Sequence, residues 1–130
     1  MGGILSALYS GNAGESEPPE ESGVTAFHSI NRWQLHFNTL KDSNTLMVID
    51  FTASWCGPCK IIKPAVYAMA TKFSNVSFCM IDVDELQEVS REFAVQAMPT
   101  FVLVKQGKEV DRVVGAKKDE LERKIAKHSS

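Results

Sequence analysis

The chain has 130 residues, of which 44% are hydrophobic, enough for one buried core in a single domain. Its formal net charge is -2 and its basic residues are spread among acids, which argues against nucleic-acid binding. Three cysteines, two of them closely paired, fit a reducing compartment better than a secreted disulfide framework. No apolar run approaches the about 18 residues of a membrane-spanning helix, and no signal-peptide pattern opens the chain. We therefore expect a soluble protein, at most anchored to a membrane.

The first 23 residues differ in composition from the rest of the chain. They are rich in glycine, serine and acidic residues and offer little to a hydrophobic core. We expect a disordered extension over residues 1–23 and a folded domain over residues 24–130. The chain opens on Met-Gly-x-x-x-Ser, the pattern for myristoylation of Gly2. One myristoyl chain gives weak, reversible membrane binding, so we expect a cytoplasmic protein with a partly membrane-associated fraction if Gly2 is acylated.

From residue 24 onward, strand and helix patterns alternate. The first strand is predicted at residues 24–28, and Ser29 can cap a helix that places Trp33, Phe37 and Leu40 on one face. Further patterns predict strands at 46–52, 76–83, 100–105 and 109–114, and helices to about residue 73, at 84–93 and at 117–128. The last two strands form a hairpin that turns at Gln106-Gly107. This order predicts an α/β domain whose central sheet is covered by helices on both faces.

Two cysteines separated by two residues follow the apolar strand at 46–52. They belong to the run Trp55-Cys56-Gly57-Pro58-Cys59. On the first turn of a helix, two such thiols share one face and can close a disulfide that stays open to attack. The helix N-terminus would lower the pKa of Cys56 below the free value of about 8.5, so Cys56 is the predicted nucleophile and Cys59 the resolving thiol. Gly57 adds little bulk to the turn, and Pro58 lacks an N–H where one would be unpaired. A structural disulfide or half of a zinc site remains the alternative.

This run, placed after a strand and followed later by Met98-Pro99-Thr100, resembles the thioredoxin family. Residues 51–60 and 113–118 are similar to the plant h-type thioredoxins, in particular the branch with an N-terminal extension. The likeness covers about residues 26–128. Thioredoxins are themselves the standard example of acidified Cys-x-x-Cys thiols, so agreement on that point adds no independent support.

The resemblance implies a thioredoxin fold with a mixed central sheet and a function in electron transport and cell redox homeostasis. The expected activity is reduction of target protein disulfides by dithiol–disulfide exchange, without a metal or organic cofactor. We expect a monomer whose partners are disulfide-containing proteins. The expected reductant is an NADPH-dependent thioredoxin reductase or a glutathione and glutaredoxin system.

Two other functions stay open at this point. One is a disulfide isomerase or oxidant, although isomerase-like members tend to carry histidine where this chain has Pro58. The other is a membrane-tethered binding module that uses the substrate groove of a thioredoxin without turnover.

Asp50 lies inside the apolar strand at 46–52, so its carboxyl should be desolvated and its pKa raised. The resemblance gives this aspartate a role in moving the proton of Cys59, and a hydrogen-bonded structural carboxyl is the alternative. Many relatives place a lysine near this acid on the adjacent strand, where this chain has Met80. We therefore do not expect a lysine-assisted proton transfer.

A substrate-binding rim is predicted around Cys56. X-Pro bonds are the only peptide bonds with a low-cost cis form, and the resemblance implies a cis bond before Pro99 with the preceding backbone facing the sulfurs. An extended target segment would add there as a strand. The resemblance assigns the flat apolar rim to Trp55, Gly57, Pro58, Ala97, Met98, Gly115 and Ala116.

The third cysteine, Cys79, alternates with apolar neighbours on the predicted strand at 76–83. A lone cysteine in such a place is usually a small buried hydrophobe, and we expect a structural role. A regulatory thiol is the alternative if Cys79 is exposed.

Overall fold

The computed structural model describes residues 17–130, so the predicted acylation site Gly2 and most of the predicted extension lie outside the described residues. The elements are the 3-10 helix η1 (Glu20–Ser22), the strands β1 (Val24–Phe27), β2 (Met47–Thr52), β3 (Ser77–Asp82), β4 (Thr100–Lys105) and β5 (Lys108–Val114), and the helices α2 (Ile30–Leu40), α3 (Gly57–Lys72), α4 (Gln87–Glu92) and α5 (Lys118–His128).

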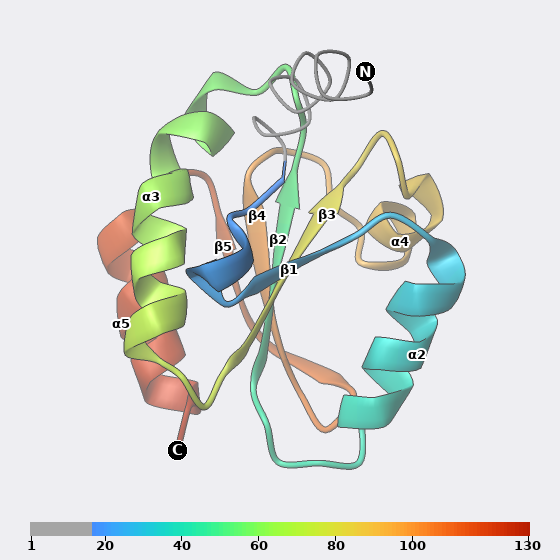
Figure 1. Cartoon of the computed structure of the whole chain (residues 1–130), viewed down its shortest axis with the longest axis vertical. Coiled ribbons are helices and arrows are strands. Elements are labelled where there is room, and N and C mark those ends of the chain that lie inside the picture. The colour runs from blue at the N-terminus through green and yellow to red at the C-terminus, as the bar shows by residue number, and fades with distance from the viewer. Residues whose placement is uncertain (1–16) are drawn as a thin grey trace, which may run out of the picture.

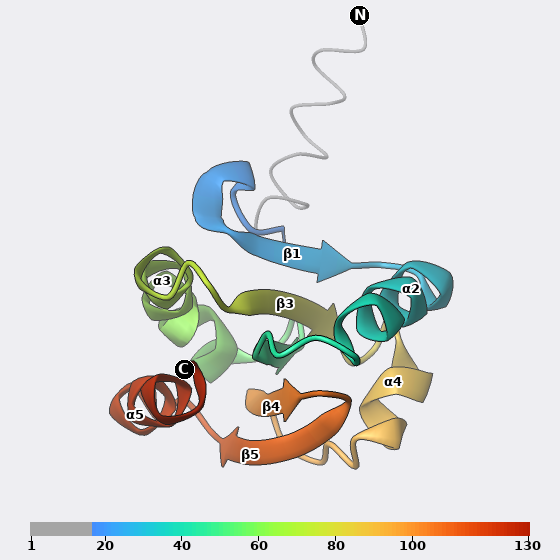
Figure 2. The ribbon, with the colours of Figure 1, turned by 90° about the horizontal axis from the view of Figure 1, so that it is seen from below.

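The sheet has the order β1-β3-β2-β4-β5. The strands β1, β3 and β2 run parallel, whereas β4 is antiparallel to β2 and β5 to β4. Every residue of the central strand β2 is buried, which explains its continuous apolar pattern. Figures 1 and 2 show α3 and α5 on one face of the sheet and α2 and α4 on the other. The predicted mixed sheet with helices on both faces is confirmed.

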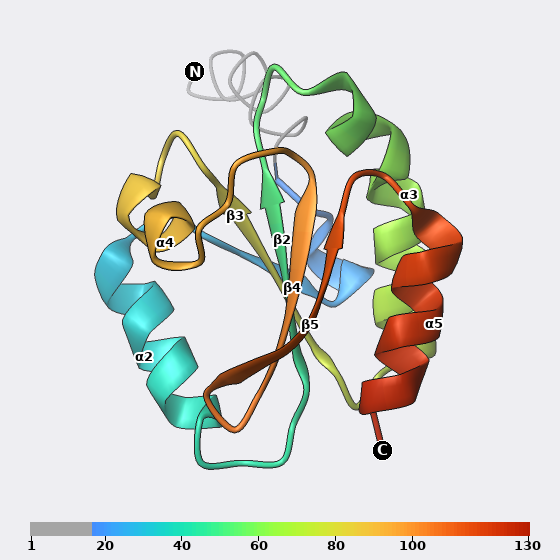
Figure 3. The same ribbon diagram turned by 180° about the vertical axis from the view of Figure 1, so that it is seen from behind.

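Two hydrophobic cores lie on the two faces of the sheet. On one face, Ile62 and Val66 of α3 pack with Leu121 and Ile125 of α5 against the strands. On the other face, Trp33 of α2 belongs to a second cluster with residues of α4 and of β2. The view from behind shows α5 beside α3, to one side of the hairpin of β4 and β5 (Figure 3). Packing on both faces fixes the position of the end of β2, from which a short loop leads into α3.

Two local signals read from the sequence are confirmed. The Ser29 hydroxyl accepts a hydrogen bond from the Arg32 N–H at 3.1 Å and caps α2. Gln106 and Gly107 have φ values of 53° and 79°, the left-handed pair that a two-residue hairpin requires.

The folded part of the chain begins earlier than the sequence predicted. The last residues of the expected extension form η1, and Ser22 is buried there, its hydroxyl accepting from the Val24 N–H at 3.2 Å. Gly23 then adopts a left-handed φ of 83° and leads into β1. The composition did not predict this segment, because η1 has no apolar side chain and is stabilised by backbone hydrogen bonds and one buried serine.

The helix expected at 84–93 is shorter than predicted and spans only Gln87–Glu92. The Asp82 carboxylate accepts hydrogen bonds from the N–H groups of Asp84 at 2.8 Å and Glu85 at 3.3 Å. Asp82 thus caps a turn, but Leu86 has a non-helical backbone with φ -118° and ψ 68°, so the turn does not continue into α4. This break leaves Asp84 and Glu85 in an acidic loop at the end of β3.

Candidate active site where β2 meets α3

The two cysteines of the motif form a disulfide with a Cα–Cα distance of 5.3 Å. Cys56 is the N-cap of α3, and its Sγ accepts a hydrogen bond from the Cys59 N–H at 3.2 Å. Within residues 17–130 no group of three or more His, Cys, Asp or Glu side chains is placed to hold a metal ion. The cysteines thus form a disulfide with an ordinary Cα–Cα distance, and the described residues bring no further ligands beside it for a zinc site.

The start of α3 distinguishes the two sulfurs chemically. Their exposed fractions, 4% for Cys56 and 2% for Cys59, are too similar to separate a nucleophile from a resolving thiol. Capping does separate them, because only Cys56 receives a backbone N–H and faces the positive end of the helix dipole. The same N–H would stabilise a thiolate at Cys56 once the disulfide is reduced.

Asp50 is buried in the middle of β2 with 3% of its surface exposed. Its Oδ1 has no hydrogen-bond partner among the described residues, which does not fit a fully hydrogen-bonded structural carboxyl. Burial raises the pKa of Asp50 from 3.8 to about 7, and the positive charge of Lys63 opposes that rise. A carboxyl that titrates near neutral pH is suited to take up and release a proton.

The loop before β4 brings backbone to the sulfurs. The Met98-Pro99 bond is cis, as the resemblance implied, and the Met98 carbonyl oxygen lies 3.6 Å from the Cys56 Sγ. The Pro99 carbonyl accepts a hydrogen bond from the Gly115 N–H at 2.8 Å. This bond ties the loop before β4 to the loop after β5, the two loops that contain Met98 and Gly115 of the predicted rim.

The remaining rim residues differ in exposure. Trp55 is 65% exposed and the half-buried Met98 packs against the cysteine pair. The exposed members of the predicted rim are Trp55, Gly57, Pro58, Ala97 and Ala116. The place of Ala116 in the rim stays a prediction.

Asp84 belongs to this site although the sequence analysis did not select it. Its Oδ2 accepts a hydrogen bond from the Trp55 indole Nε1 at 2.8 Å and holds the exposed indole in place. The run of acidic residues after β3 was the available signal, but it was interpreted as the first turn of a helix.

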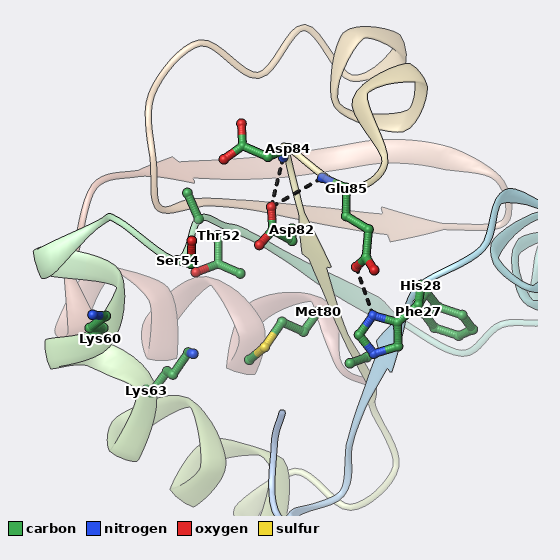
Figure 4. Close-up of a pocket in the computed structure, with 12 residues that line it drawn as sticks. Phe27, His28, Thr52, Ser54, Lys60, Lys63, Met80, Asp82, Asp84 and Glu85 are labelled. Carbon is green, nitrogen blue, oxygen red and sulfur yellow. Dashed lines mark hydrogen bonds and ion pairs between the residues drawn. The ribbon is translucent and has the colours of Figure 1, made fainter. Parts of the chain in front are cut away.

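A cavity of about 400 Å³ lies beside the site, between α3 and the ends of the parallel strands. In Figure 4, Lys60 and Lys63 line it from α3, and an acidic loop lines the opposite side. The His28 ring lies at one end of the cavity, where it is hydrogen-bonded to Glu85 at 2.8 Å and to Glu17. The full lining is Ala26, Phe27, His28, Thr52, Ala53, Ser54, Lys60, Lys63, Met80, Asp82, Asp84 and Glu85.

Cys79 is buried, and burial raises the pKa of its thiol to about 12. A thiol held neutral in this way is a poor nucleophile, which supports the expected structural role.

Comparison with known proteins agrees with this geometry. The family model for thioredoxin matches residues 28–127. Thioredoxin H2 of Arabidopsis thaliana is 59% identical, covering 98% of this chain and 98% of the relative, and Thioredoxin H2-2 of Oryza sativa subsp. japonica is 51% identical, covering 96% and 93%. The crystal structure of the thioredoxin NaTrxh from Nicotiana alata superimposes with a TM-score of 0.84 at 63% identity, covering 88% of this chain and 99% of that one. The chain belongs to the thioredoxin family, with its closely similar relatives among the plant h-type members, and is a protein-disulfide reductase.

Proposed function

We propose that Cys56 attacks the disulfide of a target protein and that Cys59 then releases the reduced target. The Cys56 thiolate forms a mixed disulfide with one target sulfur, and the other target sulfur leaves as a thiolate. Cys59 next attacks the Cys56 sulfur, which breaks the mixed disulfide and frees the second target sulfur. Two electrons pass to the target, and the chain is left with the Cys56–Cys59 disulfide. The hydrogen bond from the Cys59 N–H to the Cys56 Sγ carries this assignment.

Asp50 is the proposed acceptor for the proton that Cys59 loses before its attack. Burial keeps this carboxyl neutral below about pH 7, so at neutral pH it exists in both protonation states. A group poised in this way can accept a proton during resolution and return it in the next reduction.

Target proteins are proposed to bind along the cis Met98-Pro99 segment in an extended conformation. Exposed apolar surface at Trp55 and Pro58 beside the sulfurs supports this docking mode. Backbone pairing would supply affinity for many sequences, and the indole would bias it toward apolar neighbours.

The reductant and the location are further proposals. Close similarity to plant h-type thioredoxins supports regeneration by an NADPH-dependent thioredoxin reductase, with glutathione and glutaredoxin as the other route. We place the chain in the cytoplasm, with a membrane-associated fraction if Gly2 is myristoylated. None of the helices within residues 17–130 is long and apolar enough to cross a membrane. Intact mass of the native protein and membrane fractionation of Gly2→Ala test the lipid.

Trapping separates the roles of the two cysteines. Cys59→Ser should hold target proteins as a stable mixed disulfide, whereas Cys56→Ser should neither trap targets nor reduce insulin in the presence of dithiothreitol. Trapping by Cys56→Ser alone would reverse the assignment. A wild-type chain that failed to accelerate insulin reduction would instead favour the binding module.

A further inference from the structure

The sheet gives Asp50 no charged neighbour. Its partner in the register of β2 and β3 is Met80, which is 2% exposed, and its partner on β4 is Phe101. A buried carboxylate without a nearby cation is strongly disfavoured and stays protonated at neutral pH. A cation that stabilises the ionised form of Asp50 must therefore come from outside the sheet.

Helix α3 supplies a cation at this place. Lys63 follows Cys59 by four residues, so the two side chains lie on neighbouring turns of one helix face, and Tyr67 continues that face by another four. Lys63 is half-buried and lines the cavity together with Met80. Figure 4 shows its amino group directed into the cavity.

Among the described residues, the charge that acts on Asp50 comes from α3. After burial, Lys63 is the group that acts on the pKa of Asp50, and it lowers that pKa. Tyr67 on the same helix is a titratable neighbour, and its own pKa is raised by burial and by the charges of Asp50 and Glu17. The strand residues that face the carboxyl are uncharged. One helix face thus carries the resolving thiol, a cation and a phenol that is neutral at physiological pH.

We propose that Lys63 is a positioning residue for the resolving step: its ammonium stabilises the ionised form of Asp50 from the helix side, so that Asp50 can accept the proton of Cys59. The proposal rests on the proposed role of Asp50. It assigns to α3 the charge that the strands beside Asp50 lack.

Direct titration of Asp50 tests the contact. The ¹³C chemical shift of its carboxyl is followed with pH in the oxidised full-length chain. In Lys63→Met the Asp50 midpoint should rise by about 1 unit, and in Lys63→Arg, which keeps the charge, it should stay near the wild-type value. Lys60→Met is the matched control, since Lys60 lines the same cavity from the same helix. An unchanged midpoint in Lys63→Met, or an equal rise in Lys60→Met, overturns the proposal.

The rate of target release tests the consequence. A target disulfide-linked to Cys56 is prepared, and its release by Cys59 is measured in a single turnover across neutral pH. Lys63→Met should release the target about tenfold more slowly below the shifted midpoint, and the initial attack by Cys56 should be unchanged. The double variant with Asp50→Asn should be no slower than Asp50→Asn alone. If Lys63→Met releases the target at the wild-type rate while Asp50→Asn releases it slowly, only the proposed role of Lys63 is overturned. If Asp50→Asn also releases the target at the wild-type rate, the proposed role of Asp50 is overturned as well.

Discussion

Replacing Asp50 by asparagine should make the protein more stable, and the gain should depend on pH. The pKa of Asp50 is about 7 in the folded chain and 3.8 in the reference state. Because the folded pKa is raised, its favourable contribution is complete below pH 3.8 and is lost as the pH rises toward 7. Linkage gives a difference of about 3 kcal/mol between about pH 5 and about pH 8, where the folded chain must carry a buried carboxylate.

Urea denaturation of the oxidised wild type and of Asp50→Asn at several pH values measures this difference. Packing changes caused by the amide alter the free energy of unfolding equally at every pH. The slope of the stability difference against pH is therefore more informative than the difference at any one pH. The stability advantage of Asp50→Asn should widen steadily from acidic to neutral pH and level off above it. A pH-independent advantage would mean that Asp50 titrates near its ordinary value, and the reasoning from burial would be wrong.

Three other perturbations have definite outcomes. The hydrogen bond to Glu85 is the main reason why the pKa of His28 is raised above 6.5. The stability that it confers should therefore be complete below pH 6.5 and be lost as the pH rises through the raised pKa. Denaturation of His28→Gln and of the wild type at several pH values checks this. Asp84→Ala removes the hydrogen-bond acceptor of the Trp55 indole, so it should lower the free energy of unfolding by about 1 kcal/mol and slow insulin reduction. Asp84→Asn keeps an acceptor oxygen and should behave like the wild type. Deleting residues 1–16 should leave the melting temperature unchanged, whereas a deletion that continues through η1 should lower it, because η1 includes a buried serine.

The sequence was most informative where burial is uniform or where a residue type is tied to one backbone geometry. The strand predicted at 46–52 differs from β2 by one residue, because both of its faces are covered and its apolar run has sharp ends. Ser29 and Gly107 were placed correctly because caps and hairpin turns demand such residues. The spacing of Cys56 and Cys59 placed the disulfide for the same reason.

The start of α4 was predicted wrongly because the backbone leaves the helical conformation at one residue. Leu86 separates the turn that Asp82 caps from α4, and nothing in the hydrophobic periodicity reveals that break. Lys63 was missed for a different reason. Its spacing from Cys59 is visible in the sequence, but its relation to Asp50 depends on how α3 is rotated over the sheet, and that rotation follows from the packing of the buried face of α3.

The site brings two opposite environments together over a short stretch of chain. The interior of β2 withdraws water from Asp50 and favours its neutral form, whereas the Cys59 N–H at the start of α3 would favour the charged form of Cys56 after reduction. The two environments thus favour opposite charge states in two neighbouring residues of the site. A change that exposed the end of β2 to water would weaken both effects, since hydration would return Asp50 to an ordinary carboxylate and would screen the helix terminus. The apolar packing on both faces of the sheet is thus part of the chemistry of the site.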